Sequence, residues 1–143
     1  MDWNLERFKR QQAGDYETAL EEVRRGRKRS HWIWYIFPQL KGLGRSQMAD
    51  YYGISGLEEA KAFLKDPLLH DHLVEISRAL LDLLERNPER VFGWPDVLKV
   101  CSCMTLFERA SEGKEEVFSE VLEAFYGGRR DRRTLELLER GEG

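Results

Sequence analysis

The sequence predicts a mainly α-helical protein, a single compact multihelical domain over residues 1–143 with about seven to nine helices and little or no sheet. Apolar residues recur every three or four positions through much of the chain, as at Leu69, Leu73, Ile76 and Leu80, which is the repeat of an amphipathic helix. Runs that alternate apolar and polar residues, typical of half-buried strands, do not occur. A chain of 143 residues has the length of one ordinary domain, so a second domain is not expected.

Glycines, prolines and capping residues divide the chain into the predicted helices. Gly14 and Asp15 separate the first helix from the second. Ser30 caps the third, which ends at Phe37 because the proline that follows disfavours helical geometry in the residue before it. The predicted helices cover, in order, residues 4–11, 16–25, 30–37, 47–52, 57–66, 68–86, 96–110, 117–126 and 133–140.

Three further signals fix where the later helices begin and end. Ser46 caps the fourth helix, and Pro67 lies in the first turn of the sixth. That sixth helix carries the longest apolar repeat, so we expect it to be the longest helix and the main packing element. Gly127 and Gly128 end the eighth.

The composition favours a soluble protein with a mixed charged surface, because 41% of the residues are hydrophobic, 34% are charged and the net charge is −3. This balance gives no overall attraction to nucleic acid phosphates, so nucleic acid is not an expected partner and any anion site must be local. No segment reaches the roughly 20 apolar residues that cross a bilayer, and the start has no apolar signal region. We therefore expect a cytoplasmic protein without membrane association.

Metal ions and cofactors are not expected. His70 and His72 are two positions apart on a predicted helix and point to different sides of it, and the HExxH and CxxC spacings are absent. Cys101 and Cys103 are too close for an ordinary disulfide and too few for a zinc site, which fits a reducing compartment. On an apolar helix face such cysteines are usually inert small hydrophobes.

The segment from Gly26 to Ser46, GRKRSHWIWYIFPQLKGLGRS, predicts a binding site. It joins basic residues to aromatic rings, and a guanidinium or ammonium group can hold phosphate while an aromatic face takes a flat ring. The sequence therefore predicts a site for a small anionic ligand, a phosphorylated nucleotide-like molecule. The ordinary alternative for the aromatic residues is a place in the core, which is usual for apolar stripes at helical spacing.

The predicted ligand-binding residues have distinct roles. Lys28 and Arg45 would neutralise phosphate, Trp32 or Trp34 would stack on a ring, and Gln39 would hydrogen-bond a polar edge of it. On the helix over 96–110, residues three apart share a face and could line the same pocket. The full predicted ligand-binding set is Lys28, Ser30, Trp32, Phe37, Gln39, Arg45, Ser46, Ser102 and Thr105.

The predicted reaction is ADP-ribose-related N-glycosidic chemistry. Cleavage of such a bond needs a carboxylate or lysine near the sugar, to stabilise positive charge or to trap it. Asp96 and Lys99 are candidates for this role, and His31 is the third predicted catalytic residue. The hypothesis requires the polar groups that precede the tryptophan-rich turn to converge with those of residues 96–105 and enclose a cavity.

Two other functions compete with this hypothesis. An exposed aromatic and basic surface would suit a non-enzymatic protein-interaction module, because interfaces favour Trp, Tyr and Arg. A basic patch around Arg24 to Arg29 would suit nucleic acid only if it joined other basic residues on one face. An enclosed pocket containing His31 and Lys99 would favour the small-molecule ligand instead.

Four segments resemble an uncharacterised bacterial family, the domain of unknown function DUF 1810. In order they are YETALEEVRRGRKRSHWIWYIFPQLKGLGRS, EEAKAFLKDPLL, FGWPDVLKVCSCMTLF and FSEVLEAFYGGRRDRRTLELL. The resemblance implies one predominantly α-helical domain and carries over no catalytic mechanism. A more distant similarity to NADAR-type ADP-ribose glycosidases, which also combine lysine, tryptophan and acidic positions, has no residue-by-residue alignment.

Overall fold

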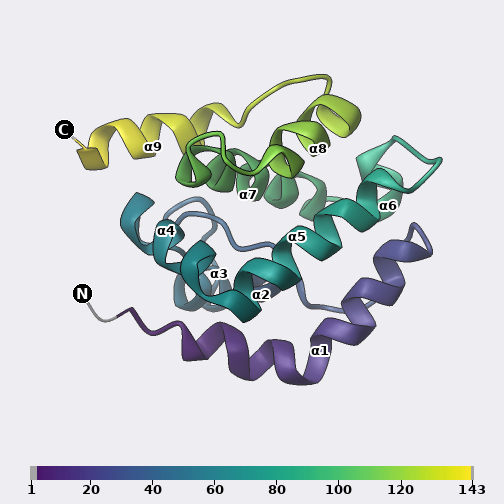
Figure 1. Ribbon diagram of the computed structural model, residues 1–143, viewed down its shortest axis with the longest axis horizontal. Coiled ribbons are helices and arrows are strands. Elements are labelled where there is room, and N and C mark those ends of the chain that lie inside the picture. Colours follow the sequence, from purple (N-terminus) through teal and green to yellow (C-terminus); the bar gives the residue numbers. More distant parts are fainter. Residues whose placement is uncertain (1–2, 143) are drawn as a thin grey trace.

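The computed structural model describes residues 3–142, and nine helices with no strand make up most of that range (Figure 1). This confirms the predicted fold class. The only pairing of the β type in these residues is an isolated bridge between Leu40 and Ile54. The helices are α1 (Glu6–Arg24), α2 (Ile33–Ile36), α3 (Gln47–Tyr52), α4 (Leu57–Lys65), α5 (Pro67–Leu81), α6 (Pro88–Phe92), α7 (Asp96–Ser111), α8 (Glu116–Tyr126) and α9 (Arg132–Glu142).

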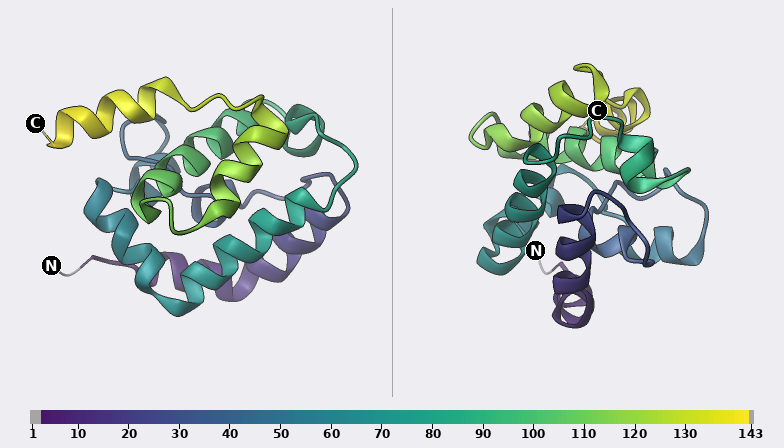
Figure 2. Two further views of the ribbon diagram at one scale, coloured as in Figure 1. Left: turned by 45° about the horizontal axis from the view of Figure 1, so that its top comes forward. Right: turned by 90° about the vertical axis from the view of Figure 1, so that its right-hand side faces the viewer.

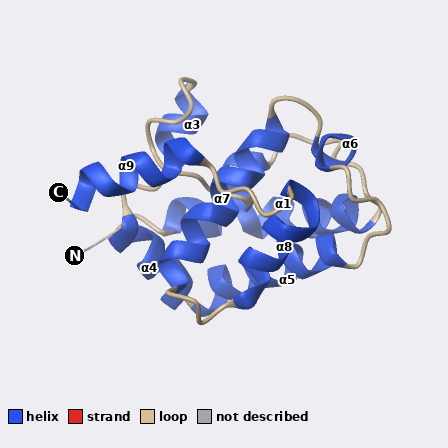
Figure 3. Cartoon of the chain, turned by 90° about the horizontal axis from the view of Figure 1, so that it is seen from above, coloured by secondary structure: helices blue, strands red, loops and turns tan. Residues whose placement is uncertain are grey.

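Helix α7 is the centre of the fold. It packs against α4, α6, α8 and α9, and its apolar residues, such as Val100, Met104 and Phe107, are fully buried. Helices α8 and α9 lie on one side of α7 and α4 on the other (Figure 1). Helices α1 and α5 run side by side beneath them (Figure 2). Seen from above, α6 and α9 lie at opposite ends of the molecule (Figure 3).

The first two predicted helices are one helix, α1, and the predicted break at Gly14 and Asp15 is wrong. A glycine inside a helix costs about 1 kcal/mol relative to alanine, but packing outweighs that cost here. The buried residues of α1 form one stripe that continues past the glycine, from Gln12 to Tyr16 and beyond. Tyr16 stacks on His72 of α5, with ring centroids 3.6 Å apart. With 19 residues, α1 is therefore longer than α5.

Ser30 does not cap the third helix, because α2 contains only residues 33–36 and starts after Trp32 without a side-chain cap. The Ser30 hydroxyl instead donates to a carboxylate oxygen of Glu22 at 2.6 Å. The backbone N–H groups of Arg29 and Ser30 and the indole Nε1 of Trp32 donate to the same carboxylate. Burial alone would raise the pKa of Glu22, but these hydrogen bonds outweigh it and lower the pKa to about 2. We call these four residues the Glu22 clamp.

Most of the later helix boundaries follow the sequence. The hydroxyl of Ser46 caps α3, Pro67 lies in the first turn of α5, and Gly127 ends α8 in the left-handed conformation. Two predictions differ. Helix α5 ends at Leu81 rather than near residue 86, and Asn87 caps a short helix, α6, where the sequence analysis expects only a break.

Candidate functional site

The basic segment before the tryptophans meets the start of α7 at an aspartate. Lys28 Nζ lies 2.9 Å from Asp96 Oδ2, and Lys99 Nζ lies 3.2 Å from Asp96 Oδ1. The side chains of Lys28 and Asp96 are largely buried, while Lys99 keeps 22% of its side chain exposed. We call these three residues the Asp96 cluster. It joins two segments that are about 70 positions apart in the sequence.

The rings of Trp32 and Trp34 lie next to these lysines and, within residues 3–142, do not line a cavity large enough for a ligand. The ammonium group of Lys28 lies 5.1 Å from the ring centroid of Trp32, and that of Lys99 lies 5.2 Å from Trp34. Trp32 and Phe37 are each only 1% exposed. They therefore belong to the core, and the structure offers neither ring as a stacking surface for a ligand.

A cavity of about 310 Å³ opens where the loop after α2 faces α7 and the start of α9. Three predicted site residues line it together: Gln39 from the loop, and Lys99 and Ser102 from α7. The loop after α2 thus meets α7 at an accessible hollow, which we call the Lys99 cavity, whereas the polar residues before the tryptophans, Lys28, Ser30 and His31, do not line it. Its lining residues are Gln39, Leu43, Gly44, Pro95, Leu98, Lys99, Ser102, Asp131 and Arg133.

The loop that carries Gln39 is held close to its neighbours. Its backbone pairs with the segment after α3, where Ile54 N donates to Gln39 O at 2.9 Å. Gly44 lets the loop approach α3, since a Cβ at this position would lie 2.6 Å from Ala49 Cβ. Behind Gln39, the Nε1 of Trp34 is buried and has no hydrogen-bond partner among residues 3–142. Trp34 and Gln39 both line a void of about 10 Å³. The wall of the site therefore contains one buried hydrogen-bond donor, the indole N–H of Trp34, that no residue in the range 3–142 uses.

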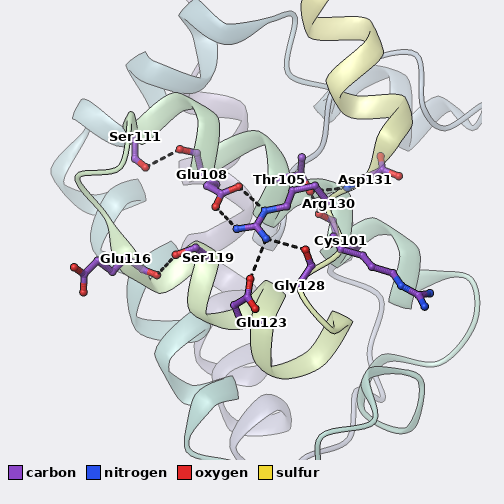
Figure 4. Close-up of polar contacts among 11 residues, drawn as sticks. Cys101, Thr105, Glu108, Ser111, Glu116, Ser119, Glu123, Gly128, Arg130 and Asp131 are labelled. Carbon is purple, nitrogen blue, oxygen red and sulfur yellow. Dashed lines mark hydrogen bonds and ion pairs between the residues drawn. The ribbon is translucent and has the colours of Figure 1, made fainter.

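Helix α9 joins the site through Asp131, the residue before its first turn. Ser102 Oγ lies 2.9 Å from Asp131 Oδ2, which also accepts from the backbone N–H and hydroxyl of Thr134. The backbone N–H of Asp131 donates to Thr105 Oγ1 at 2.9 Å (Figure 4). Thr105 is 1% exposed, so its hydroxyl fixes the start of α9 and does not reach the cavity.

Five other predicted residues do not line the Lys99 cavity. Ser30 belongs to the Glu22 clamp and Ser46 caps α3. His31 and Arg45 are exposed, and neither lines the cavity. Lys28 is held in the Asp96 cluster, so it supports Lys99 rather than facing the hollow.

The sequence analysis missed two charged residues of the cavity, Asp131 and Arg133. The sequence places the last helix directly after Asp131 and gives neither Asp131 nor Arg133 a role in the site. The local signal is the order Asp131 and then Thr134, in which the carboxylate accepts from the N–H three residues later, as at a helix start. Their approach to Lys99 depends on the packing of α9 on α7, which no local pattern encodes.

A larger cavity of about 690 Å³ lies elsewhere, lined mainly by residues of α4 and α9 with Trp3 and Lys41. None of the predicted site residues lines it. Its buried carboxylate, Glu59, is paired with Arg7 at 2.9 Å, and Lys61 lies 3.2 Å from Glu112. These charges are already compensated within the protein.

The histidines in the described part of the chain do not form a metal site. Residues 3–142 contain no group of three or more His, Cys, Asp or Glu side chains placed to hold a metal ion. His70 is engaged by Glu115 at 2.5 Å and by Asp71 at 2.9 Å. No helix in this range is long and apolar enough to cross a membrane.

Comparison with known families settles the relationship of the chain. The model of a family described as a protein of unknown function, DUF1810, matches residues 2–138. The chain belongs to the DUF1810 family. This DUF1810 protein is similar to the crystal structure of the conserved hypothetical protein Rv1873 from Mycobacterium tuberculosis, with 48% identity and a TM-score of 0.92. The match covers 95% of this chain and 96% of that one. No curated protein matches the chain.

Proposed function

We propose that this DUF1810 protein binds a phosphorylated, nucleotide-like small molecule in the Lys99 cavity. The observation that carries the proposal is the convergence of two cations from different helices, Lys99 and Arg133, on one hollow together with the Gln39 amide. Lysine and arginine are the side chains that proteins use to hold phosphate. The volume of about 310 Å³ lies at the lower end of the roughly 300–1,000 Å³ of small-molecule sites.

The charges around the Lys99 cavity favour an anionic ligand, although the whole chain has a net negative charge. Lys28, Lys99 and Arg133 carry three positive charges, against two negative charges on Asp96 and Asp131. Arg133 is exposed and forms no ion pair with residues 3–142, so its guanidinium is available. It takes the place that the sequence analysis gave to Lys28 and Arg45.

The reaction that fits this ligand is cleavage of an N-glycosidic bond in an ADP-ribose-related molecule. Water would add to the anomeric carbon while the base leaves with its bonding electron pair and a proton. Lys99 is the titratable group of the predicted catalytic set that lines the cavity. Asp96 lies 3.2 Å behind it and positions its ammonium group. His31 does not line the cavity, so we give it no part in the step.

Ligand binding is tested by calorimetry and thermal shift with ADP-ribose, AMP and ribose 5-phosphate. Replacing Lys99 with glutamine removes one charge-assisted hydrogen bond, worth about 1.5–3 kcal/mol, so the dissociation constant should rise roughly tenfold to a hundredfold. Lys114→Gln is the matched control, because Lys114 is exposed in the turn after α7 and lines none of the cavities described above.

Two results would count against the proposal. Absence of binding by the wild-type protein to all three compounds rejects the ligand class. Equal binding by the Lys99→Gln and Lys114→Gln variants rejects the location. Chromatography of ADP-ribose and of NAD after incubation with the protein tests the reaction separately, because the free base is a direct product of the cleavage.

The interaction-module alternative lacks a supporting observation. It needs the aromatic wall to face solvent, but Trp32, Tyr35 and Phe37 are each less than 5% exposed. Trp94 is well exposed and lies two positions before Asp96, which contacts Lys28, but one exposed ring does not make the aromatic wall that this alternative needs. We therefore do not propose a protein-docking function for this segment.

A further inference from the structure

A second cavity of about 550 Å³ adjoins the Lys99 cavity. The two share Leu98 of α7 and Asp131 before α9, so these residues form a ridge between them. On the far side of the ridge the wall comes from α8 and the segment after it. We call this hollow the Phe125 cavity, and its lining residues are Leu98, Cys101, Phe125, Tyr126, Gly127, Arg129, Arg130 and Asp131.

Resting on the proposed function, we propose that one ligand spans both hollows. The phosphate lies at Lys99 and Arg133, the sugar hydroxyls meet Asp131, and the flat ring occupies the Phe125 cavity. The ring site is thus a different one from the tryptophan face that the sequence analysis suggests, which is buried.

The Phe125 cavity suits an uncharged ring because Leu98, Phe125 and Tyr126 give it apolar surface and Arg130 is already paired with Glu108 and Glu123. Leu98 is 51% exposed on the ridge, so its apolar side chain is available for contact with a ring. Tyr126 also lines this cavity, and its hydroxyl is used within the fold, donating to Val97 O at 2.8 Å.

The arginines of the Phe125 cavity have different roles. Arg130 already donates four hydrogen bonds: Glu108 accepts two, and Glu123 and the carbonyl of Gly128 accept one each (Figure 4). Its charge is thereby neutralised, and a second phosphate gains nothing from it. Arg129 is exposed at the edge and forms no ion pair with residues 3–142. A planar guanidinium can stack on the face of a ring.

Asp131 sets the direction in which the ligand lies. Its Oδ2 accepts from Ser102 and Thr134, whereas Oδ1 has no hydrogen bond with residues 3–142. An ionised carboxylate only accepts hydrogen bonds, so it suits sugar hydroxyls and repels phosphate. The phosphate is therefore directed to Lys99 and Arg133, and the ring to the other side of the ridge.

Cys101 provides a reporter for the Phe125 cavity. Its thiol lines this cavity, while Cys103 is fully buried and protected from reagents. Burial, reinforced by the nearby Asp131, raises the pKa of Cys101 to about 11. The thiol therefore reacts slowly at neutral pH, and alkylation by N-ethylmaleimide can be followed over minutes to hours.

The test compares AMP, which has a ring, with ribose 5-phosphate, which has none. Leu98→Ala should weaken AMP binding roughly tenfold through lost apolar contact with the ring and should affect ribose 5-phosphate binding much less, although Leu98 lines both cavities. Leu84→Ala is the control, because Leu84 is a fully exposed leucine elsewhere. AMP should also slow the alkylation of Cys101, and ribose 5-phosphate should not.

The outcomes separate this inference from the proposed function. If both compounds bind, with equal affinity and with no effect of Leu98→Ala, the phosphate site stands and the ring site is wrong. Unchanged alkylation of Cys101 under saturating AMP also overturns the ring site. If neither compound binds, the proposed function fails and this inference fails with it.

Discussion

Replacing Glu22 with glutamine should destabilise the protein by about 1–2 kcal/mol at pH 7 and should remove part of its acid sensitivity. In the Glu22 clamp the carboxylate accepts four hydrogen bonds, with donor distances of 2.6–2.9 Å. Glutamine keeps one acceptor oxygen but turns an NH₂ group toward these donors. The clamp joins α1 to the segment that carries Lys28, so the loss is felt next to the Asp96 cluster.

The magnitude follows from the pKa of Glu22. A fall from 4.5 to about 2 corresponds to roughly 3.4 kcal/mol at about 1.36 kcal/mol for each pKa unit. Glu22 is half-buried, and solvent screening reduces this to about 1–2 kcal/mol. Because the folded-state pKa is the lower one, the stabilisation is complete above pH 4.5 and is lost as the pH falls toward 2.

Urea unfolding of the wild-type protein and the Glu22→Gln variant between pH 7 and pH 3 measures this effect. The difference in free energy of unfolding should be constant near neutral pH and should shrink below pH 4.5. Glu21→Gln is the control, since Glu21 forms only an exposed ion pair with Arg25, and its effect should stay within about 0.5 kcal/mol. A pH-independent difference, or none at all, would refute the reasoning.

Two backbone positions and one buried ion pair give further predictions. Gly44→Ala should destabilise by about 1–3 kcal/mol, because the new Cβ would lie 2.6 Å from Ala49 Cβ; a melting temperature equal to that of the wild type would contradict this. Gly14→Ala should raise the melting temperature, since the site is open and alanine favours a helix by about 1 kcal/mol; a lower value would show that the glycine has another role. Arg7→Met should cost about 3–5 kcal/mol in urea unfolding by leaving Glu59 buried without its partner at 2.9 Å. The double variant with Glu59→Met should recover part of that loss, and purely additive effects would argue against coupling.

The sequence predicts the fold well where the signals are local. Ser46 and Pro67 mark helix starts because capping and proline geometry depend on neighbouring residues alone. Gly14 misleads because its local cost is outweighed by the packing of α1 on α5. Ser30 misleads because its hydroxyl has a better partner in Glu22, eight positions away.

The candidate site was only partly predictable for the same reason. Helical spacing on α7 and the loop after α2 suffice to nominate Gln39, Lys99 and Ser102, which the structure places around one cavity. Trp32 looks equally suitable in the sequence, but it is buried. The sequence alone does not distinguish a tryptophan in the core from one that stacks on a ligand. Arg133 could not be distinguished from other arginines, because its position depends on how α9 packs on α7.

Because the Lys99 cavity depends on α9 and the residue before it, the protein can bind the proposed ligand only after this helix has packed on α7. Lys99 and Gln39 are synthesised well before Asp131 and Arg133. A nascent chain that stops at residue 130 would have one wall of the hollow and lack both of these charges. Capacity for the ligand would thus arise only once α9 has been made and has packed on α7, so retention on an immobilised nucleotide would select molecules in which α9 has docked.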